Sequence, residues 1–147
     1  MDLDRARAFI QANHRAVLLT RHADGRPQLS PVIVGLARDG RHAVISTRET
    51  AVKTRNVRRD PNVALCVFTD AFFGEWVQID GTAEVLDAPD SVEPLVEYYR
   101  NIAGEHPDWD EYRAAMVKQG KSLIRITPER WGPVATGGFP ARLAESD

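Results

Sequence analysis

The sequence contains few of the features that support cross-linking, membrane insertion or nucleic-acid binding. Its single cysteine, Cys66, cannot form an internal disulfide and lies in an apolar run, so we expect a buried, inert thiol. No apolar stretch approaches the roughly 20 residues of a membrane-spanning helix, and the N-terminal residues lack the apolar core of a signal peptide. The formal net charge of -2 argues against a protein that coats nucleic acid. We therefore expect a cytoplasmic protein that binds neither membranes nor nucleic acid.

Signatures of the common catalytic and metal centres are also missing. The four histidines are scattered, and none is paired with cysteine or with another histidine at the spacing of metal ligands. The sequence has no nucleophile-elbow serine, no P-loop and no glycine-rich dinucleotide fingerprint. We therefore predict no metal and assign no catalytic residue. Any redox or group-transfer chemistry must come from a bound cofactor.

What the sequence does contain is a regular succession of short β patterns. With 147 residues, 43% of them hydrophobic, the chain has the size and composition of one domain with one core. Turns at Asp24-Gly25 and at Arg38-Asp39-Gly40 separate the first three strands, and Gly81 indicates a bulge within a long fifth strand. The predicted strands cover residues 15–21, 28–37, 42–47, 63–69, 75–86 and 122–127.

Four helices are predicted around these strands. One covers residues 3–12, and a short one lies between residues 50 and 59. A third helix follows Asp87, which we take as its N-cap, and ends at Gly104; a fourth begins after Asp108 and ends at Gly120. Mostly antiparallel strands with few helices between them do not form a parallel βαβ sheet. They predict a mainly β fold, a closed or split β-barrel with flanking helices, because closure removes the exposed strand edges. Residues 1–131 form the predicted domain, and residues 132–147, rich in Gly, Pro and Ala, a C-terminal loop or flexible tail.

The densest chemical feature is the segment 47–59, which holds five basic residues and three threonines. It spans the end of a strand and the start of a helix, where unpaired N–H groups and the helix dipole favour anions. Lys53 and Asn56 share a helical face, whereas Arg58 and Arg59 point elsewhere and are predicted to be ordinary surface residues. The segment therefore predicts a phosphate-binding site. The alternative is a solvated basic helix face, since charge runs on surfaces are common.

Four further positions are candidates on weaker grounds. Pro31 cannot donate to a sheet ladder, so its strand is locally an edge or a bulge with backbone groups free for a ligand. Gln28 and Ser30 lie on one face of that strand and could face a cofactor ring, although alternation alone favours polar residues that point to solvent. Trp76, in the fifth strand, is favoured as a barrel or interface residue over a ring-stacking one.

Four sequence words carry a family resemblance: DGRPQLS at residues 24–30, KTRNVRRDP at 53–61, GTA at 81–83, and YRNIAGEH at 99–106 followed by DWDEYR at 108–113. Over residues 16–131 the chain resembles the FMN-binding split β-barrel oxidoreductases related to pyridoxamine phosphate oxidase. It is most similar to the actinobacterial branch that depends on coenzyme F420, a deazaflavin. The motif words of true pyridoxamine phosphate oxidases around the substrate phosphate are missing, and the segment after Trp131 departs from such relatives.

The resemblance implies a homodimer with two cofactor sites at the subunit interface. It implies that reduced F420 passes a hydride to an electron-poor unsaturated small molecule. An FMN-dependent oxidoreductase of the same fold and a non-enzymatic flavin or F420 carrier or sensor remain the alternatives. The residues implied to hold the cofactor phosphate and tail are Thr47, Arg48, Thr50, Lys53, Arg55 and Asn56. Those implied to lie along the ring or near the interface are Gln28, Ser30, Pro31 and Trp76.

Overall fold

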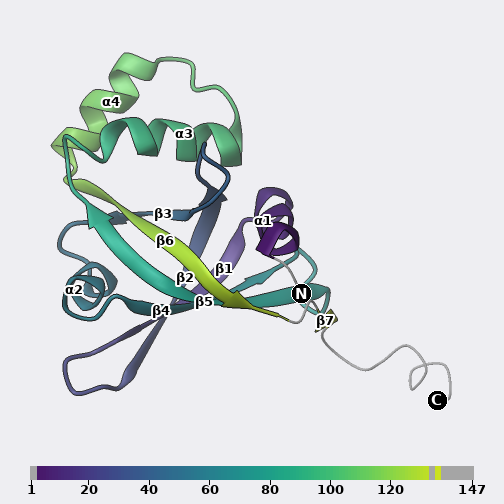
Figure 1. The fold of residues 1–147 in the computed structure, drawn as a ribbon. Helices are drawn as coiled ribbons and strands as arrows, with labels where there is room; N and C mark the ends of the chain where they lie inside the picture. Colours follow the sequence, from purple (N-terminus) through teal and green to yellow (C-terminus); the bar gives the residue numbers. More distant parts are fainter. Residues whose placement is uncertain (1–2, 133–134, 137–147) are drawn as a thin grey trace, which may run out of the picture.

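The chain folds into a β-barrel closed by six antiparallel strands (Figure 1). The computed structural model describes residues 3–132 and 135–136. The strands run in the order β4-β1-β2-β3-β6-β5, and β4 pairs with β5 to complete the circle. The strands are β1 Arg15–Arg21, β2 Pro27–Leu36, β3 Ala43–Arg48, β4 Asn62–Phe68, β5 Glu75–Leu86, β6 Lys121–Trp131 and β7 Ala135–Thr136. The helices are α1 Leu3–Ala12, α2 Val52–Arg59, α3 Val92–Ala103 and α4 Trp109–Lys118.

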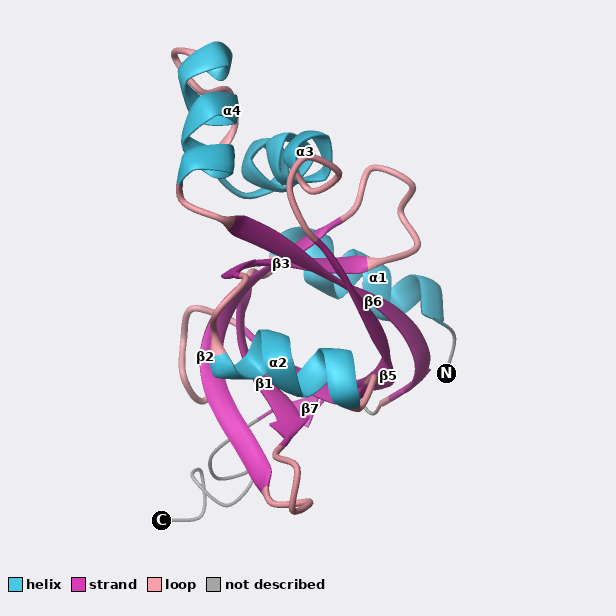
Figure 2. Cartoon of the chain, turned by 90° about the vertical axis from the view of Figure 1, so that its left-hand side faces the viewer, coloured by secondary structure: helices cyan, strands magenta, loops and turns pink. Residues whose placement is uncertain are grey.

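Alternation along the strands builds the core inside the barrel. In β1 every second residue, beginning at Ala16, is buried, and its neighbours are only half-buried or exposed. Helices α1 and α2 lie at opposite ends of the barrel, and Ile10 of α1 belongs to the main core (Figures 1 and 2). Helices α3 and α4 lie outside, over β3 and β6, where Leu95 and Met116 form a second core with Val44 and Leu123. None of the described helices is long and apolar enough to cross a membrane.

The barrel is split where β2 separates from β3. Their ladder covers only Val34–Leu36 of β2 opposite residues 43–45, although β2 begins at Pro27. Val34 N–H donates to the His14 carbonyl (2.8 Å) on the β1 side, so by antiparallel alternation the backbone groups of Leu29, Pro31 and Ile33 face away from β1. These groups form an open edge, and the Tyr98 hydroxyl donates to the Ile33 carbonyl (2.8 Å) where the split begins. The strand break expected at Pro31 is therefore an edge.

The structure corrects three local predictions. Asp87 is not the N-cap of α3; Ser91 holds that position. The Asp87 carboxylate instead accepts bonds from Arg58 (2.7 Å) and from the Ser122 hydroxyl (2.6 Å), which tie α2 to β6. Strand β6 continues past residue 127 to Trp131. Cys66 is half-buried rather than fully buried.

Two further predictions concern the bulge in β5 and the C-terminal tail. The bulge expected at Gly81 is confirmed, because the register of β5 against β6 shifts between Asp80 and Gly81. Within the predicted tail, Ala135–Thr136 forms the short strand β7, which pairs with β5. The predicted tail residues 133–134 and 137–147 lie outside the described residues.

Candidate functional site

The turn between β3 and the start of α2 is built by threonine hydroxyls. Thr54 Oγ1 donates to the Arg48 carbonyl (2.7 Å) and lies 3.1 Å from Thr47 Oγ1. Thr47 and Thr54 are both buried, so they fix the turn, whereas Thr50 lies exposed at its tip. Ala51 is the N-cap and offers no side-chain acceptor. The N–H groups of the first helical turn are therefore left for an anion.

Cations converge on this helix start from two elements. Arg48 ends β3, and the register of the β3–β6 ladder places Lys121 directly opposite it. Burial lowers the pKa of Lys53, in the first turn of α2, and the nearby Lys121 ammonium lowers that pKa further. No ion pair among the described residues involves any member of this basic cluster, which consists of Arg48, Lys53, Arg55 and Lys121. The cluster thus carries positive charge that no ion pair among the described residues offsets, although the Glu49 carboxylate lies against Gly120, next to Lys121.

Lys121 is a site residue that the sequence did not reveal. It stands 62 positions after Arg59, the last residue of the basic segment, at the first residue of a strand. The only signal that could have found it is the pairing of β3 with β6. A lone lysine before an apolar strand is otherwise an ordinary edge residue.

Asn56 and Arg59 differ from their predicted roles. Asn56 is 3% exposed; its Nδ2 donates to Thr20 Oγ1 (3.0 Å), and its Oδ1 accepts from Arg59 (2.8 Å). Arg59 also donates to the Arg21 carbonyl (2.9 Å). Arg58 and Arg59 are both exposed, but neither is an ordinary surface residue, because Arg58 binds Asp87 and Arg59 binds Asn56. The side-chain hydrogen bonds of Asn56 are made within the protein. The helix face that carries Lys53 is thereby fixed against β1.

Strand β2 places the other predicted residues beside α2. The half-buried Gln28 is joined to Asn56 through Thr20, whose hydroxyl donates to Gln28 Oε1 (3.2 Å). Ser30 Oγ is buried, and within the part of the chain that the structure describes it has no hydrogen-bond partner. Pro31 is exposed on the open edge. An orphaned hydroxyl next to unpaired backbone groups suits a polar ring that lies along β2.

Trp76 is not brought to this site within one chain. It lies in β5, opposite Phe68 of β4 and Ala135 of β7. Strands β1 and β4 separate β5 from β2, a span of three strand spacings or about 14 Å. Arg55 is exposed on the surface of α2. The fold thus gathers the phosphate-binding candidates and Gln28, Ser30 and Pro31, and it leaves Trp76 apart.

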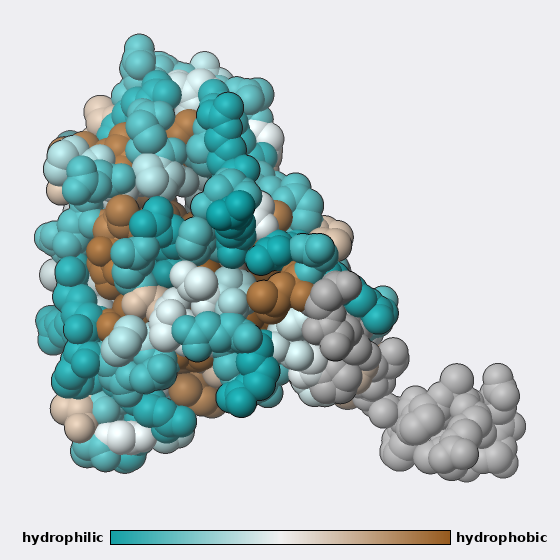
Figure 3. Space-filling model, viewed as in Figure 1, coloured by the Kyte–Doolittle hydropathy of each residue, from teal (hydrophilic) through white to brown (hydrophobic). Residues whose placement is uncertain are grey.

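The outer face of β2, β1 and β4 carries an apolar surface, which the exposed Arg15 interrupts at one end, between Ile33 and Phe68. Leu29 and Ile33 are 61% and 52% exposed, and a hollow of about 410 Å³ opens between Ile33 and Phe68. By contrast, the apolar residues on the face formed by β5 and β6, which faces the viewer in Figure 3, lie in separate patches. We call the apolar surface on β2, β1 and β4 the outer apolar stripe. It consists of Val17, Leu19, Leu29, Pro31, Ile33, Ala64, Cys66 and Phe68.

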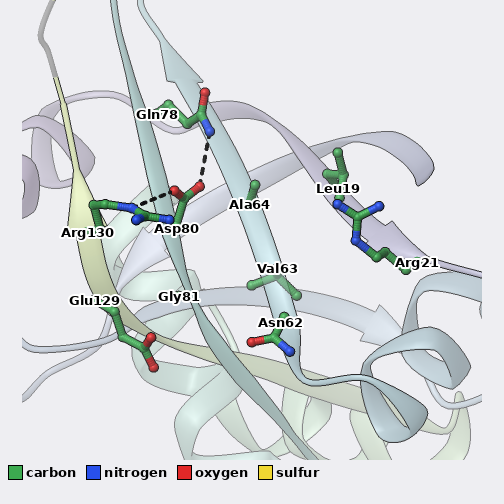
Figure 4. Close-up of a pocket in the computed structure, with 10 residues that line it drawn as sticks. All are labelled: Leu19, Arg21, Asn62, Val63, Ala64, Gln78, Asp80, Gly81, Glu129 and Arg130. Carbon is green, nitrogen blue, oxygen red and sulfur yellow. Dashed lines mark hydrogen bonds and ion pairs between the residues drawn. The ribbon is translucent and has the colours of Figure 1, made fainter. Parts of the chain in front are cut away.

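A polar pocket of about 390 Å³ borders the stripe at Leu19 and Ala64 (Figure 4). Asp80 forms an ion pair with Arg130 (3.2 Å) in its wall and accepts a hydrogen bond from Gln78 (3.0 Å). Gln78, Asp80 and Arg130 are thus partnered with one another. None of the ten predicted site residues lines the pocket, so it is separate from the candidate site.

Several solved structures share this architecture. A protein of Mycobacterium tuberculosis described as conserved hypothetical, Rv2991, has a TM-score of 0.73 at 21% identity, covering 96% of this chain and 94% of that chain. A protein described as an F420 reductase has a TM-score of 0.65 at 18% identity, covering 85% and 94%. HutZ, a haem storage protein of Vibrio cholerae, has a TM-score of 0.68 at 18% identity, covering 93% and 98%.

These three structures share the fold with the chain, at identities too low to carry a function over. The family model for pyridoxamine 5'-phosphate oxidase matches residues 3–135, which takes in the whole barrel, the basic cluster and the open edge of β2. The predicted split β-barrel is thereby confirmed. The chain belongs to the pyridoxamine 5'-phosphate oxidase family.

Proposed function

We propose that the protein binds coenzyme F420 and works as an F420-dependent oxidoreductase that reduces an electron-poor unsaturated small molecule. The observation that carries the proposal is the basic cluster, unpaired with any described carboxylate, at the uncapped start of α2. It lies beside the open edge of β2, which leaves polar groups for a ring. A phosphate on one side and a heteroaromatic ring on the other match these two halves.

The residues present fit such a group without a catalytic side chain. Lys53, Arg48 and Lys121 would hold the phosphate together with the first-turn N–H groups of α2. Gln28 and Ser30 would contact the ring. When bound, reduced F420 supplies a hydride, so the protein has to fix the ring and hold the acceptor in a reactive orientation. We assign no acid or base to the chain.

Titration of the purified protein with F420 and with FMN, followed by cofactor fluorescence, tests the choice of cofactor. We expect F420 to bind more tightly. A tenfold tighter affinity for FMN would transfer the proposal to an FMN-dependent enzyme, which the same phosphate site also suits. Tight binding of F420 without oxidation of its reduced form by a panel of enones and quinones would favour a carrier or sensor.

As the pH rises, cofactor affinity should begin to fall at a lower pH than it would if Lys53 had the usual pKa of a lysine. Burial and Lys121 lower the pKa of Lys53 from 10.5, so its ammonium loses its proton at a lower pH and the site then attracts phosphate less. Lys53→Arg should keep its affinity over this range, because guanidinium stays charged. Titrations of both proteins from neutral pH to about pH 10 measure this. Since both bind the same cofactor, its own ionisation cancels in the ratio of the two dissociation constants, and a constant ratio contradicts the prediction.

We also propose that a second copy of the chain covers the outer apolar stripe. The stripe borders the open edge of β2 at Leu29, Pro31 and Ile33, so a subunit seated there also borders the cofactor site. An isologous dimer would bury the stripe on both copies at once. It would also bring Trp76 and its neighbours on the same outer face near the other subunit's site.

Leu29→Glu should convert this dimer into a monomer, because it places a charge on the stripe opposite the apolar Leu19. Light scattering should give a mass near twice 16.4 kDa for the parent and near 16.4 kDa for the variant. Val117→Glu is the matched control, since Val117 is also exposed (56%) but lies on α4, outside the stripe. A parent protein that is monomeric and binds F420 at full affinity would overturn both the dimer and the shared site.

A further inference from the structure

Four side chains connect the end of α2 to the open edge of β2. They are Arg59, Asn56, Thr20 and Gln28, joined in that order by hydrogen bonds of 2.8, 3.0 and 3.2 Å. Thr20 is fully buried and Asn56 nearly so, so water competes little for these bonds. We call this chain of bonds the amide relay.

The direction of every bond in the amide relay follows from Arg59. Guanidinium can only donate, so the group of Asn56 that faces it must be the oxygen Oδ1. The Asn56 amide nitrogen then faces Thr20 and donates to its oxygen, which leaves the single hydroxyl proton of Thr20 for Gln28. Gln28 therefore turns its oxygen inward.

The other half of the Gln28 amide faces the open edge. Gln28 Nε2 donates one N–H to the Leu29 carbonyl (3.3 Å), a group on that edge. A glutamine on a free strand could present either its oxygen or its NH₂ group, and the two choices select opposite partners. The amide relay occupies the oxygen and Leu29 accepts one N–H, so the second N–H of the NH₂ group is left for a ligand.

We propose that Arg59, Asn56 and Thr20 are positioning residues that hold the Gln28 amide with its NH₂ group toward the cofactor site. The site then selects a ligand with a hydrogen-bond acceptor, a ring carbonyl oxygen, at this position. The identity of that ligand rests on the proposed function, whereas the orientation of the amide rests on the relay and on the bond from Gln28 to the Leu29 carbonyl. Arg59 thus acts on the ligand without touching it.

Asn56→Asp reverses the relay with almost no change in shape. The new carboxylate still pairs with Arg59 but cannot donate to Thr20, so the Thr20 hydroxyl turns to donate to it. Thr20 then accepts from Gln28 Nε2, and Gln28 presents its oxygen to the edge instead. The ion pair with Arg59 compensates the charge of the new side chain.

Amide NMR of the cofactor-free protein tests the orientation directly. Selective ¹⁵N labelling of glutamine gives four side-chain NH₂ pairs, from residues 11, 28, 78 and 119, and Gln28→Ala identifies one of them. Asn56→Asp should shift the Gln28 pair strongly. Thr82→Val, which removes a hydroxyl that bonds Glu129 outside the relay, should leave it unchanged. Unchanged Gln28 signals in Asn56→Asp would overturn the relay.

A double-mutant cycle tests its effect on the ligand. Asn56→Asp should weaken F420 binding at least tenfold in the parent, but less than about threefold in a Gln28→Ala background, where only the added charge acts. An equal loss in both backgrounds would overturn the selection of an acceptor. If the parent binds neither F420 nor FMN, the proposed function fails, and the NMR measurement still decides the orientation of the amide.

Discussion

Lys53→Met should weaken F420 binding by about 1–3 kcal/mol, roughly ten- to a hundredfold, the range for losing a charge-assisted contact to phosphate. Lys53 lies in the first turn of α2, where its ammonium adds to the unpaired N–H groups of the helix start. Among the described residues it has no carboxylate partner, so its removal leaves no buried charge unpaired. Methionine keeps the length of the side chain. Fluorescence titration measures the loss.

The unfolding temperature of the cofactor-free protein separates binding from folding in this variant. It should stay unchanged or rise slightly, because the substitution removes the repulsion between Lys53 and Lys121. Lys118→Met is the matched control; this exposed lysine lies at the end of α4 and should bind F420 as the parent does. If Lys53→Met binds F420 with the affinity of the parent, the basic cluster is only a solvated surface and not a phosphate-binding site.

Most of the fold could be predicted because its information is local. Alternation of apolar residues marked each barrel strand, and Asp24-Gly25 and Gly81 marked a turn and a bulge at the positions where the structure has them. The helix start after β3 was also local, since strand pattern and basic segment meet there. The prediction that Asp87 caps α3 was wrong because its carboxylate bonds residues 29 and 35 positions away, and no short-range sequence pattern shows such partners.

The candidate site could be predicted only in part, because its geometry depends on which strands are neighbours. The basic segment was found, but Lys121 joins it through the β3–β6 ladder. Arg59 was taken for a surface residue by helical spacing alone, which cannot show that Asn56 and the Arg21 carbonyl lie within its reach. Pro31 was the exception. Its missing N–H already indicated the edge where the barrel splits.

Gly81→Ala should destabilise the protein, although the change adds a single methyl group. A Cβ at residue 81 would lie 2.3 Å from the Thr127 carbonyl oxygen, a backbone atom that cannot rotate away. At this bulge Gly81 pairs with Pro128 of β6, so both strands would have to separate to make room. We expect the free energy of unfolding to fall by about 1–3 kcal/mol, as in overpacked cores. Thermal unfolding should show a transition roughly 3–10 °C lower.

Gly25→Ala shows how much of that loss comes from crowding. Gly25 has a φ of 89° in the β1–β2 turn, but nothing lies within 4 Å of its would-be Cβ. Its replacement should cost only about 1 kcal/mol, the conformational preference of glycine at positive φ. Both variants should be compared at one protein concentration, because the proposed dimer would make the transition depend on it. If Gly81→Ala unfolds at the parent's temperature, then β5 and β6 do not approach each other as closely at the bulge as described, and the barrel wall beside Thr127 tolerates side chains.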